Sequence, residues 1–256
     1  MKIEILGCSG GMGSGEFTTS IRIDERLLID AGSGLGKLSQ DEMLAIKQIF
    51  LTHAHLDHIC FLPLLLDNLF EQLESPIEVL ALPETLDVLR KHIFNWQVWP
   101  DFSVLPDVHQ PVLCYSSLTM AQPQQTGDLT LWPMLATHVV PACGYRVVSA
   151  EGKVFCFSGD TAYDGAVLQA YNQAGPINML MLECAFPNRL TTVAEQSKHL
   201  TPQRLLQFLQ QLNHPPESIL ITHLKPAFRK EICDELMALS LSSKLYFLGS
   251  GDTFFL

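Results

Sequence analysis

Basic residues are scarce in this sequence, and its cysteines form no Cys-x-x-Cys pair. Among 256 residues, 16 Lys and Arg stand against 27 Asp and Glu, so the formal charge is −11. Because affinity for a phosphate backbone comes largely from Lys and Arg, a nucleic acid polymer is not expected as the main partner. The seven cysteines are odd in number and scattered, which is typical of reduced thiols in a cytoplasm.

A signal peptide, a membrane-spanning segment and a long linker are also missing from the sequence. Residues 1–7 have neither the basic segment nor the long apolar core of a secretion signal. The apolar run Ile59–Leu69 is too short to span a bilayer and contains Asp67. We therefore expect a cytoplasmic protein that does not contact a membrane. No repeat or Pro/Gly-rich linker divides the chain, so residues 1–256 are expected to form a single domain.

The sequence does contain a dense cluster of metal-binding side chains. The segment His53-Ala54-His55-Leu56-Asp57-His58 directly follows Ile49–Leu51, an apolar run short enough to be a buried strand. Three imidazoles and a carboxylate this close together would crowd and repel one another, and a divalent cation removes that problem. Zinc takes both imidazole nitrogen and carboxylate oxygen. A His-rich surface loop is the rival interpretation, but the position directly after a strand favours a metal site.

Strand and helix patterns alternate in both halves of the chain, which predicts one layered α/β domain. Residues 59–73 are expected to form a helix, and residues 244–256 a final hairpin. Thr201 and Pro202 are typical of a helix start, as N-cap and first helical residue. Asp30 stands at a predicted strand end, where its carboxylate either fixes the tautomer of a ligand histidine or caps a turn.

Two loops are open to more than one interpretation. Five glycines within residues 7–15 favour a tight loop where the backbone approaches the active site. A phosphate cradle is the rival, but no phosphate-binding helix motif follows. Irregular residues 94–113 contain Trp96, Trp99 and Phe102. They form either a lid over a pocket or a hydrophobic plug.

Potential metal ligands recur at the ends of four apolar strands, and in layered α/β folds such ends converge on one rim. We assign two sets of three ligands and one bridge, namely His53, His55 and His138 for one metal ion, Asp57, His58 and His223 for a second, and Asp160 between them. This set leaves room for a hydroxide between two ions ~3.5–4 Å apart. Zinc is the expected divalent metal, and manganese or iron suits the same ligands.

Several segments together resemble the metallo-β-lactamase superfamily, and within it the class II 3′,5′-cyclic-nucleotide phosphodiesterases. The general resemblance covers nearly the whole chain and rests on the Asp30-Ala31-Gly32 turn, the metal loop, His138, Asp160 and His223. The narrower one rests on His53–Ile59, Glu183-Cys184-Ala185-Phe186-Pro187-Asn188 and His199-Leu200-Thr201-Pro202. It implies a four-layer αββα sandwich. The chain departs from the family at Cys60–Leu64, where small residues usually follow the metal motif.

The resemblance implies hydrolysis of a cyclic phosphodiester such as cyclic AMP. The residues expected to take part in catalysis are Asp57, Asp160, Glu183 and His199. Asp160 would orient the hydroxide, and His199, oriented by Glu183, would protonate the leaving 3′-oxygen. Alternatively, Glu183 and His199 form a purely structural pair. Adenine needs a stacking surface, which residues 96–102 supply unless they belong to the core.

Other functions remain open at this stage. Glu183 and His199 also resemble motifs of tRNase Z-like endonucleases, although the acidic charge opposes a tRNA substrate. The same two-metal site suits hydrolases of thioesters, lactones or β-lactams. A non-catalytic protein that binds a nucleotide through metal is a further alternative. The expected partner is a small-molecule substrate, and a homodimer is left open.

Overall fold

Two seven-stranded sheets form the centre of the molecule in the computed structural model, which describes residues 1–256. The first sheet contains, in spatial order, β14 (Thr253–Phe255), β1 (Lys2–Gly7), β2 (Ser20–Ile23), β3 (Leu27–Ile29), β4 (Gln48–Phe50), β5 (Ile77–Ala81) and β6 (Leu113–Ser117). The second contains β13 (Lys244–Phe247), β12 (Ser218–Thr222), β11 (Met179–Glu183), β10 (Val154–Phe157), β9 (Cys143–Val148), β8 (Leu129–Leu135) and β7 (Gln124–Thr126).

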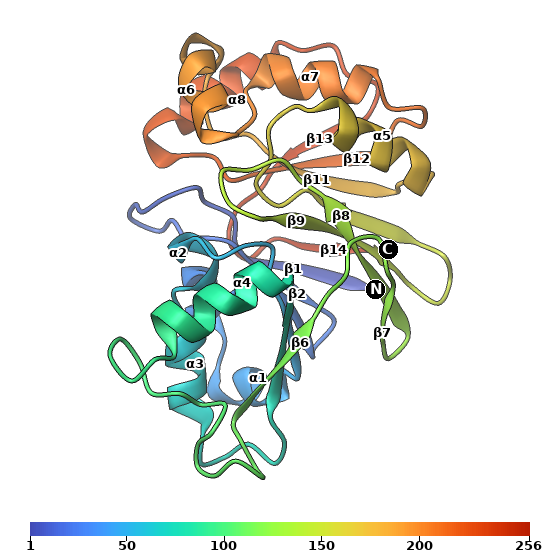
Figure 1. Cartoon of the computed structure of the whole chain (residues 1–256). Helices are drawn as coiled ribbons and strands as arrows, with labels where there is room; N and C mark the ends of the chain where they lie inside the picture. The colour runs from blue at the N-terminus through green and yellow to red at the C-terminus, as the bar shows by residue number, and fades with distance from the viewer.

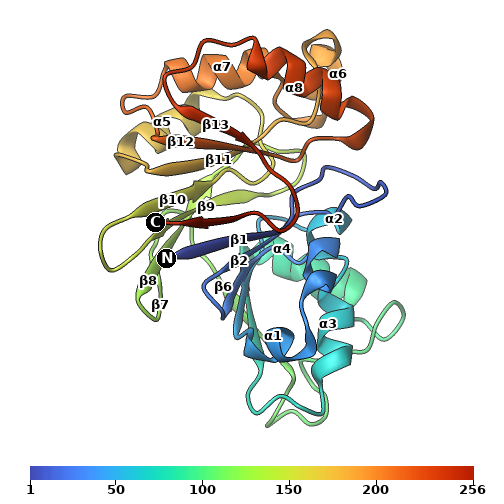
Figure 2. The same cartoon turned by 180° about the vertical axis from the view of Figure 1, so that it is seen from behind.

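Helices cover the outer face of each sheet. Those of the first half are α1 (Gln40–Ala45), α2 (Leu56–Ile59), α3 (Leu62–Leu69) and α4 (Pro83–Val88). Those of the second half are α5 (Gly165–Ala174), α6 (Thr191–Ser197), α7 (Pro202–Gln210) and α8 (Arg229–Met237). Figures 1 and 2 show the two groups on opposite sides of the paired sheets. The predicted four-layer αββα sandwich is confirmed.

Three apolar clusters hold these layers together. One fills the space between the sheets and includes Ile3, Ile21 and Phe155, while the other two lie under the helices on the outer faces. Because both faces of the central strands are buried, a strand such as β11 has every residue buried and shows no polar alternation. The expectation of a single domain over residues 1–256 stays a prediction. None of the helices has the length and apolar character needed to cross a membrane.

The predicted C-terminal hairpin is wrong. Strand β13 pairs with β12 in the second sheet, whereas β14 pairs antiparallel with β1 in the first, with Phe255 opposite Lys2. The connection between them crosses from one sheet to the other, and Leu248 is buried in the cluster between the sheets. Two apolar runs separated by glycines suit a hairpin equally well, so the local pattern does not distinguish the two outcomes.

The helix predicted over residues 59–73 is divided in two. Helix α2 ends at Ile59, and α3 begins at Leu62 with Pro63 in its first turn. Proline has no N–H to donate and is tolerated only at a helix start, so the chain restarts there. The bulky Phe61 between the two helices lies against Gly36, where a β-carbon would approach the Phe61 ring to 2.6 Å. Gly36 thus leaves room for the large Phe61 side chain at a position where the family usually has a small residue.

The aromatic loop after α4 packs mainly as core. Phe102 is buried in the outer cluster of the first sheet, 6.3 Å from the Phe70 ring between ring centroids. Trp99 is partly buried against the same cluster, while Trp96 is 62% exposed. The interpretation as a hydrophobic plug is therefore confirmed for Phe102.

Candidate metal centre

The carboxyl ends of six strands meet at one edge of the sandwich. Strands β3 and β4 run parallel to each other in the first sheet, and β10, β11 and β12 do so in the second. Strand β8 lies antiparallel to β9, which lies antiparallel to β10, so β8 also ends at this edge. Open α/β sheets bind ligands outside these carboxyl ends. The residues at or just after these strand ends are Asp30, His53, His138, Asp160, Glu183 and His223.

The first predicted ligand set is brought together from two sheets. His55 Nδ1 lies 3.0 Å from His53 Nε2 and 3.2 Å from His138 Nε2, although His138 is 83 residues away in the chain. Asp160 Oδ2 lies 3.7 Å from His53 Nε2 and 3.9 Å from His138 Nε2. Three imidazole nitrogens and one carboxylate oxygen therefore face a common point, within reach of one small cation.

The second set lies directly beside it. His58 Nε2 is 3.7 Å from Asp57 Oδ2, and His223 Nε2 is 3.9 Å from the same oxygen. Asp160 lies between the sets, with Oδ2 at 3.5 Å from His58 Nε2 and Oδ1 at 3.3 Å from His223 Nδ1. All seven predicted ligands are thus found together, and the Asp160 carboxylate faces both groups.

Hydrogen bonds on the far side of the rings fix how they point. His58 Nδ1 donates to Asp30 Oδ2 at 2.7 Å, and His53 Nδ1 lies 3.0 Å from the Thr52 hydroxyl, which itself donates to Asp30. The predicted contact between Asp30 and a histidine of the motif is confirmed. His138 Nδ1 lies 3.2 Å from the Lys198 carbonyl. In His53 and His138 the second nitrogen is left with its lone pair toward the cluster. Burial lowers the pKa of His58, but Asp160 and Asp30 outweigh this and raise it well above its ordinary value, so a cation bound there would displace a proton.

The atoms at the centre fit divalent cations. His58 Nε2 and His223 Nδ1 are buried and have no hydrogen-bond partner, an arrangement that is costly unless something else binds them. Burial lowers the pKa of His53 well below its ordinary value and that of His138 to about 4, so both rings are neutral near pH 7. Metal ligation requires neutral imidazole. Burial favours the protonated form of Asp160, but His223 and His58 outweigh this effect and hold the pKa of Asp160 well below its usual range.

Glu183 and His199 form a buried pair at the same edge. His199 Nδ1 lies 2.8 Å from Glu183 Oε1, whose carboxylate also accepts from the backbone N–H groups of Thr161 and Ala185. Burial lowers the pKa of His199, but the adjacent Glu183 carboxylate outweighs this and raises the pKa above its ordinary value. The His199 ring stacks on His223 with centroids 5.2 Å apart. Because the ring also contacts His138, with centroids 5.1 Å apart, His199 lies directly against two of the predicted ligands.

Backbone strain is concentrated around these residues. Asp30 and His223 adopt positive φ angles of 60° and 58°, which cost roughly 1–3 kcal/mol each and persist only where the surroundings impose them. Gly10 of the glycine-rich loop is part of the surroundings of His223, because a β-carbon at Gly10 would lie only 2.4 Å from the His223 carbonyl oxygen. The loop was predicted to bring its backbone close to the site, and the approach to His223 confirms this.

A hollow of about 830 Å³ opens beside His138. Its lining comes from the segments after β5, β6 and β8, among them Leu118, Leu135 and Val139, and the only charged side chain in it is Glu84. The hollow therefore lacks the cationic side chains that a long polyanion needs. No residue of the aromatic loop after α4 lines this hollow.

Some residues that shape the site were not predicted from the sequence. Thr52 precedes the metal motif and bonds to both Asp30 and His53, and the only signal for it is a hydroxyl at the strand end. The Lys198 carbonyl that holds His138 carries no side-chain signal at all. His199 was predicted as a proton donor, but the structure also places it within ligand reach of Asp160 and His223. The histidines left out of the site, His92, His109 and His214, are exposed.

Known proteins share this sequence pattern and fold. The family model of the beta-lactamase superfamily domain matches residues 25–224, well over half of the chain. A probable 3′,5′-cyclic-nucleotide phosphodiesterase of Yersinia pestis is 26% identical over 285 residues, covering 90% of this chain and 79% of the relative. The crystal structure of unliganded yeast PDE1 aligns with a TM-score of 0.80 at 21% identity, covering 100% and 99% of the two chains. Human short-form tRNase Z aligns at 0.70 and 18% identity, covering 99% and 98%. The chain therefore belongs to the beta-lactamase superfamily, as the resemblance to its metal-dependent members predicted.

Proposed function

We propose that this protein is a metal-dependent phosphodiesterase that hydrolyses a 3′,5′-cyclic nucleotide such as cyclic AMP. The observation that carries the proposal is the pair of ligand sets that share Asp160, with the Glu183–His199 pair beside them. Two-metal sites of this kind act on phosphoesters by holding both the attacking and the leaving oxygen. The name of the Yersinia pestis relative supports the same substrate class.

Two divalent ions would be held by residues already in place. His53, His55 and His138 would hold one, Asp57, His58 and His223 the other, and Asp160 both. Imidazole and carboxylate together favour zinc, while manganese and iron accept the same ligands. When bound, the cations supply positive charge opposite the phosphoryl oxygens and lower the pKa of water. The free thiols of all seven cysteines suit a reducing compartment, and we propose the cytoplasm as the location.

The chain's own side chains would handle orientation and proton transfer. Asp160 is positioned to orient the attacking water, whose oxygen forms the new bond to phosphorus as the P–O3′ bond breaks. The leaving 3′-oxygen must gain a proton, and His199 Nε2 is our candidate donor. Glu183 accepts from His199 Nδ1 at 2.8 Å, which fixes the ring orientation. Asp57 lies between His58 and His223 and would help them to hold the second metal ion.

Replacement of His199 tests this role. In His199→Ala we expect turnover of cyclic AMP to fall about 100-fold or more, the range that a positioned acid or base contributes. Turnover of bis(p-nitrophenyl) phosphate should fall far less, because p-nitrophenolate leaves without a proton. Steady-state kinetics on both substrates, with metal content measured on the same samples, separates the two cases. Equal losses on both substrates together with lost metal would show that His199 is a ligand instead. Unchanged cyclic AMP turnover would remove it from the mechanism.

A substrate panel tests the function itself. We expect the metal-loaded protein to hydrolyse cyclic AMP, cyclic GMP and bis(p-nitrophenyl) phosphate, with the cyclic nucleotides giving the highest kcat/KM. The panel includes a thioester, a lactone and a β-lactam as matched controls on the same enzyme preparation. Preferred hydrolysis of one of these three would contradict the phosphodiesterase proposal. Thermal stabilisation by cyclic AMP without product after hours would identify a nucleotide-binding protein instead.

One observation favours a second candidate, tRNA processing. Human short-form tRNase Z shares the fold over 99% of this chain, and the Glu183–His199 pair resembles a motif of that family. Against it stand the formal charge of −11 and the absence of Lys and Arg from the hollow beside His138. Incubation with a precursor tRNA at low salt decides between the two functions, because electrostatic binding of tRNA is strongest at low salt. Cleavage of the tRNA would support the second candidate, and its absence would exclude it.

A further inference from the structure

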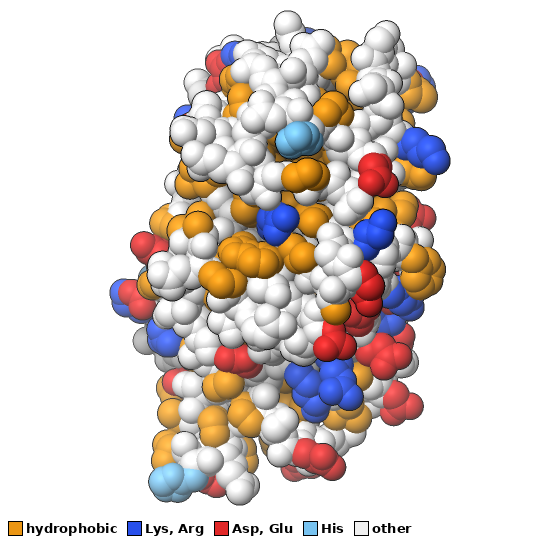
Figure 3. All heavy atoms as spheres, turned by 90° about the vertical axis from the view of Figure 1, so that its right-hand side faces the viewer, with side chains coloured by type: hydrophobic (Ala, Val, Ile, Leu, Met, Phe, Trp, Pro, Cys, Tyr) orange, Lys and Arg blue, Asp and Glu red, His pale blue; other side chains and the backbone are white.

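A second hollow lies on the outer face of the second sheet, beside α5. It measures about 530 Å³, within the size range of small-molecule sites, and seven of its ten lining residues are hydrophobic. Its floor is formed by β8 and β9, its wall by Ala170 and Ala174 of α5, and one end by Met120. Figure 3 looks onto this side of the molecule and shows single basic side chains among hydrophobic ones near its middle.

The only charged residue in this hollow is Arg146, and no carboxylate pairs with it. It stands opposite Trp132 in the β8–β9 pairing, so both side chains project from the same face of the sheet. The guanidinium carbon lies 5.4 Å from the centre of the Trp132 ring. Arg146 forms no ion pair, and its Nε is buried without a hydrogen bond. The charge of this guanidinium is therefore not neutralised by any carboxylate of the protein, and an anion bound in the hollow would neutralise it.

Most other arginines in this acidic chain are paired with carboxylates. Arg22 contacts Glu4 and Glu42, Arg189 contacts Glu231, and Arg204 contacts Glu195. An unpaired guanidinium within an apolar hollow is therefore unusual for this molecule. It matches a ligand with one anionic group and an apolar body.

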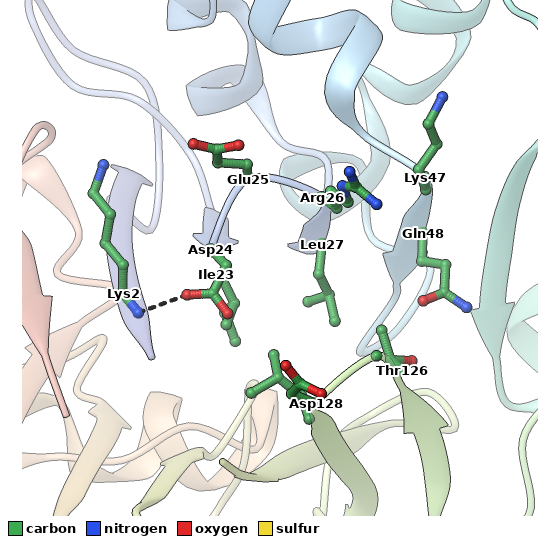
Figure 4. Close-up of a pocket in the computed structure, with 12 residues that line it drawn as sticks. Lys2, Ile23, Asp24, Glu25, Arg26, Leu27, Lys47, Gln48, Thr126 and Asp128 are labelled. Carbon is green, nitrogen blue, oxygen red and sulfur yellow. Dashed lines mark hydrogen bonds between the residues drawn. The ribbon is translucent and has the colours of Figure 1, made fainter. Parts of the chain in front are cut away.

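A third hollow, of about 580 Å³, provides a contrast. Figure 4 shows its charged side chains, in which Asp24, Glu25 and Asp128 lie among Lys2, Arg26 and Lys47. The Lys2 backbone N–H donates to Asp24 Oδ1 at 2.8 Å. Because acids and bases are balanced there, this hollow offers no net attraction to an anion. Arg26 has no ion pair either, which makes it a matched control for Arg146.

We propose that the Arg146 hollow binds a small amphipathic monocarboxylate, with its carboxylate on the guanidinium and its alkyl or aryl body along Trp132, Met134 and Ala170. The planar fork of arginine matches a carboxylate with two parallel hydrogen bonds. Trp132, Met134 and the alanines of α5 supply apolar surface for a chain that carries no second charge. The hollow adjoins the one beside His138, with which it shares Met120 and Leu135, but His138 does not line it and Arg146 does not line the other.

Titration calorimetry with octanoate on the metal-loaded protein tests the proposal. Octanoate should bind saturably, 1-octanol at least tenfold more weakly, and Arg146→Gln should lose about tenfold or more in octanoate affinity while keeping its affinity for octanol. Arg26→Gln should bind octanoate like the unmodified protein. Affinity should also rise by up to about fourfold per added methylene from hexanoate to decanoate, a test that needs no variant.

Other results would overturn the proposal. Equal octanoate affinity in Arg146→Gln, equal losses in Arg146→Gln and Arg26→Gln, or no dependence on chain length would each exclude a site built on Arg146. Carboxylates also bind metal ions, so phosphodiester hydrolysis is measured in parallel. Inhibition by octanoate that competes with substrate, at the concentration that saturates calorimetry, would place the ligand at the metal centre instead.

Discussion

Removal of metal by a chelator is expected to abolish phosphodiester hydrolysis and to lower the melting temperature by about 8–16 °C. A ligand present at 1,000 times its Kd stabilises the folded state by ~4 kcal/mol. For a chain of this size each kcal/mol corresponds to roughly 2–4 °C. The physical reason is the crowding of His53, His55 and His138, whose ring nitrogens approach to 3.0 and 3.2 Å and whose lone pairs a bound cation would hold together. Melting curves and activity of chelated and zinc-reloaded protein provide the measurement.

The control for this experiment is a histidine outside the cluster. His109→Ala should show the same decrease on chelation as the unmodified protein, because the exposed His109 does not contact the site. Excess zinc should restore both stability and activity. A melting temperature that stays constant after elemental analysis has shown full metal loss would contradict the expected coupling of metal binding to stability.

Asp160→Asn should reduce kcat by about 1,000-fold and leave one metal ion or none in the protein. The amide has nearly the size of the carboxylate but no charge, so the change removes the group that faces both ligand sets. Loss of several kcal/mol of transition-state stabilisation corresponds to this factor, since each ~1.4 kcal/mol is tenfold. Kinetics with cyclic AMP and elemental analysis of the same sample check both parts.

Asp128→Asn is the matched control for that substitution. Asp128 is an exposed carboxylate in the charge-balanced hollow of Figure 4, away from the strand ends that carry the ligands. Its replacement should leave kcat and metal content unchanged. Full activity of Asp160→Asn with two bound ions would refute the bridging role, while loss of both metal and folding would be visible in its melting curve.

The parts of the site that could be predicted are those with a local signal. His53–His58 lie within six positions, and His138, Asp160 and His223 each end a readable apolar strand. Which atoms face one another could not be predicted, because this depends on how two sheets pack. Thr52, the Lys198 carbonyl and the approach of His199 to His223 follow from that packing.

The fold could likewise be predicted where the sequence contains a local signal, and the prediction was wrong where the outcome depends on long-range packing. Alternating helices and strands indicate layers, but the partner of a terminal strand is set by long-range geometry. Thus β13 and β14 were expected to pair with each other and instead belong to different sheets. The division between α2 and α3 had a local signal in Pro63, which outweighs the continuous apolar pattern around it.

The pairing of β1 with β14 has a consequence for synthesis on the ribosome. The outer edge of β1 is covered by residues 250–256, about 250 positions later in the chain. While translation proceeds, Lys2–Gly7 therefore keeps one row of backbone donors and acceptors unpaired, a state in which strand edges invite aggregation. We expect the nascent N-terminal half to depend on chaperones until these last residues emerge, because closure of so long a loop is also slow.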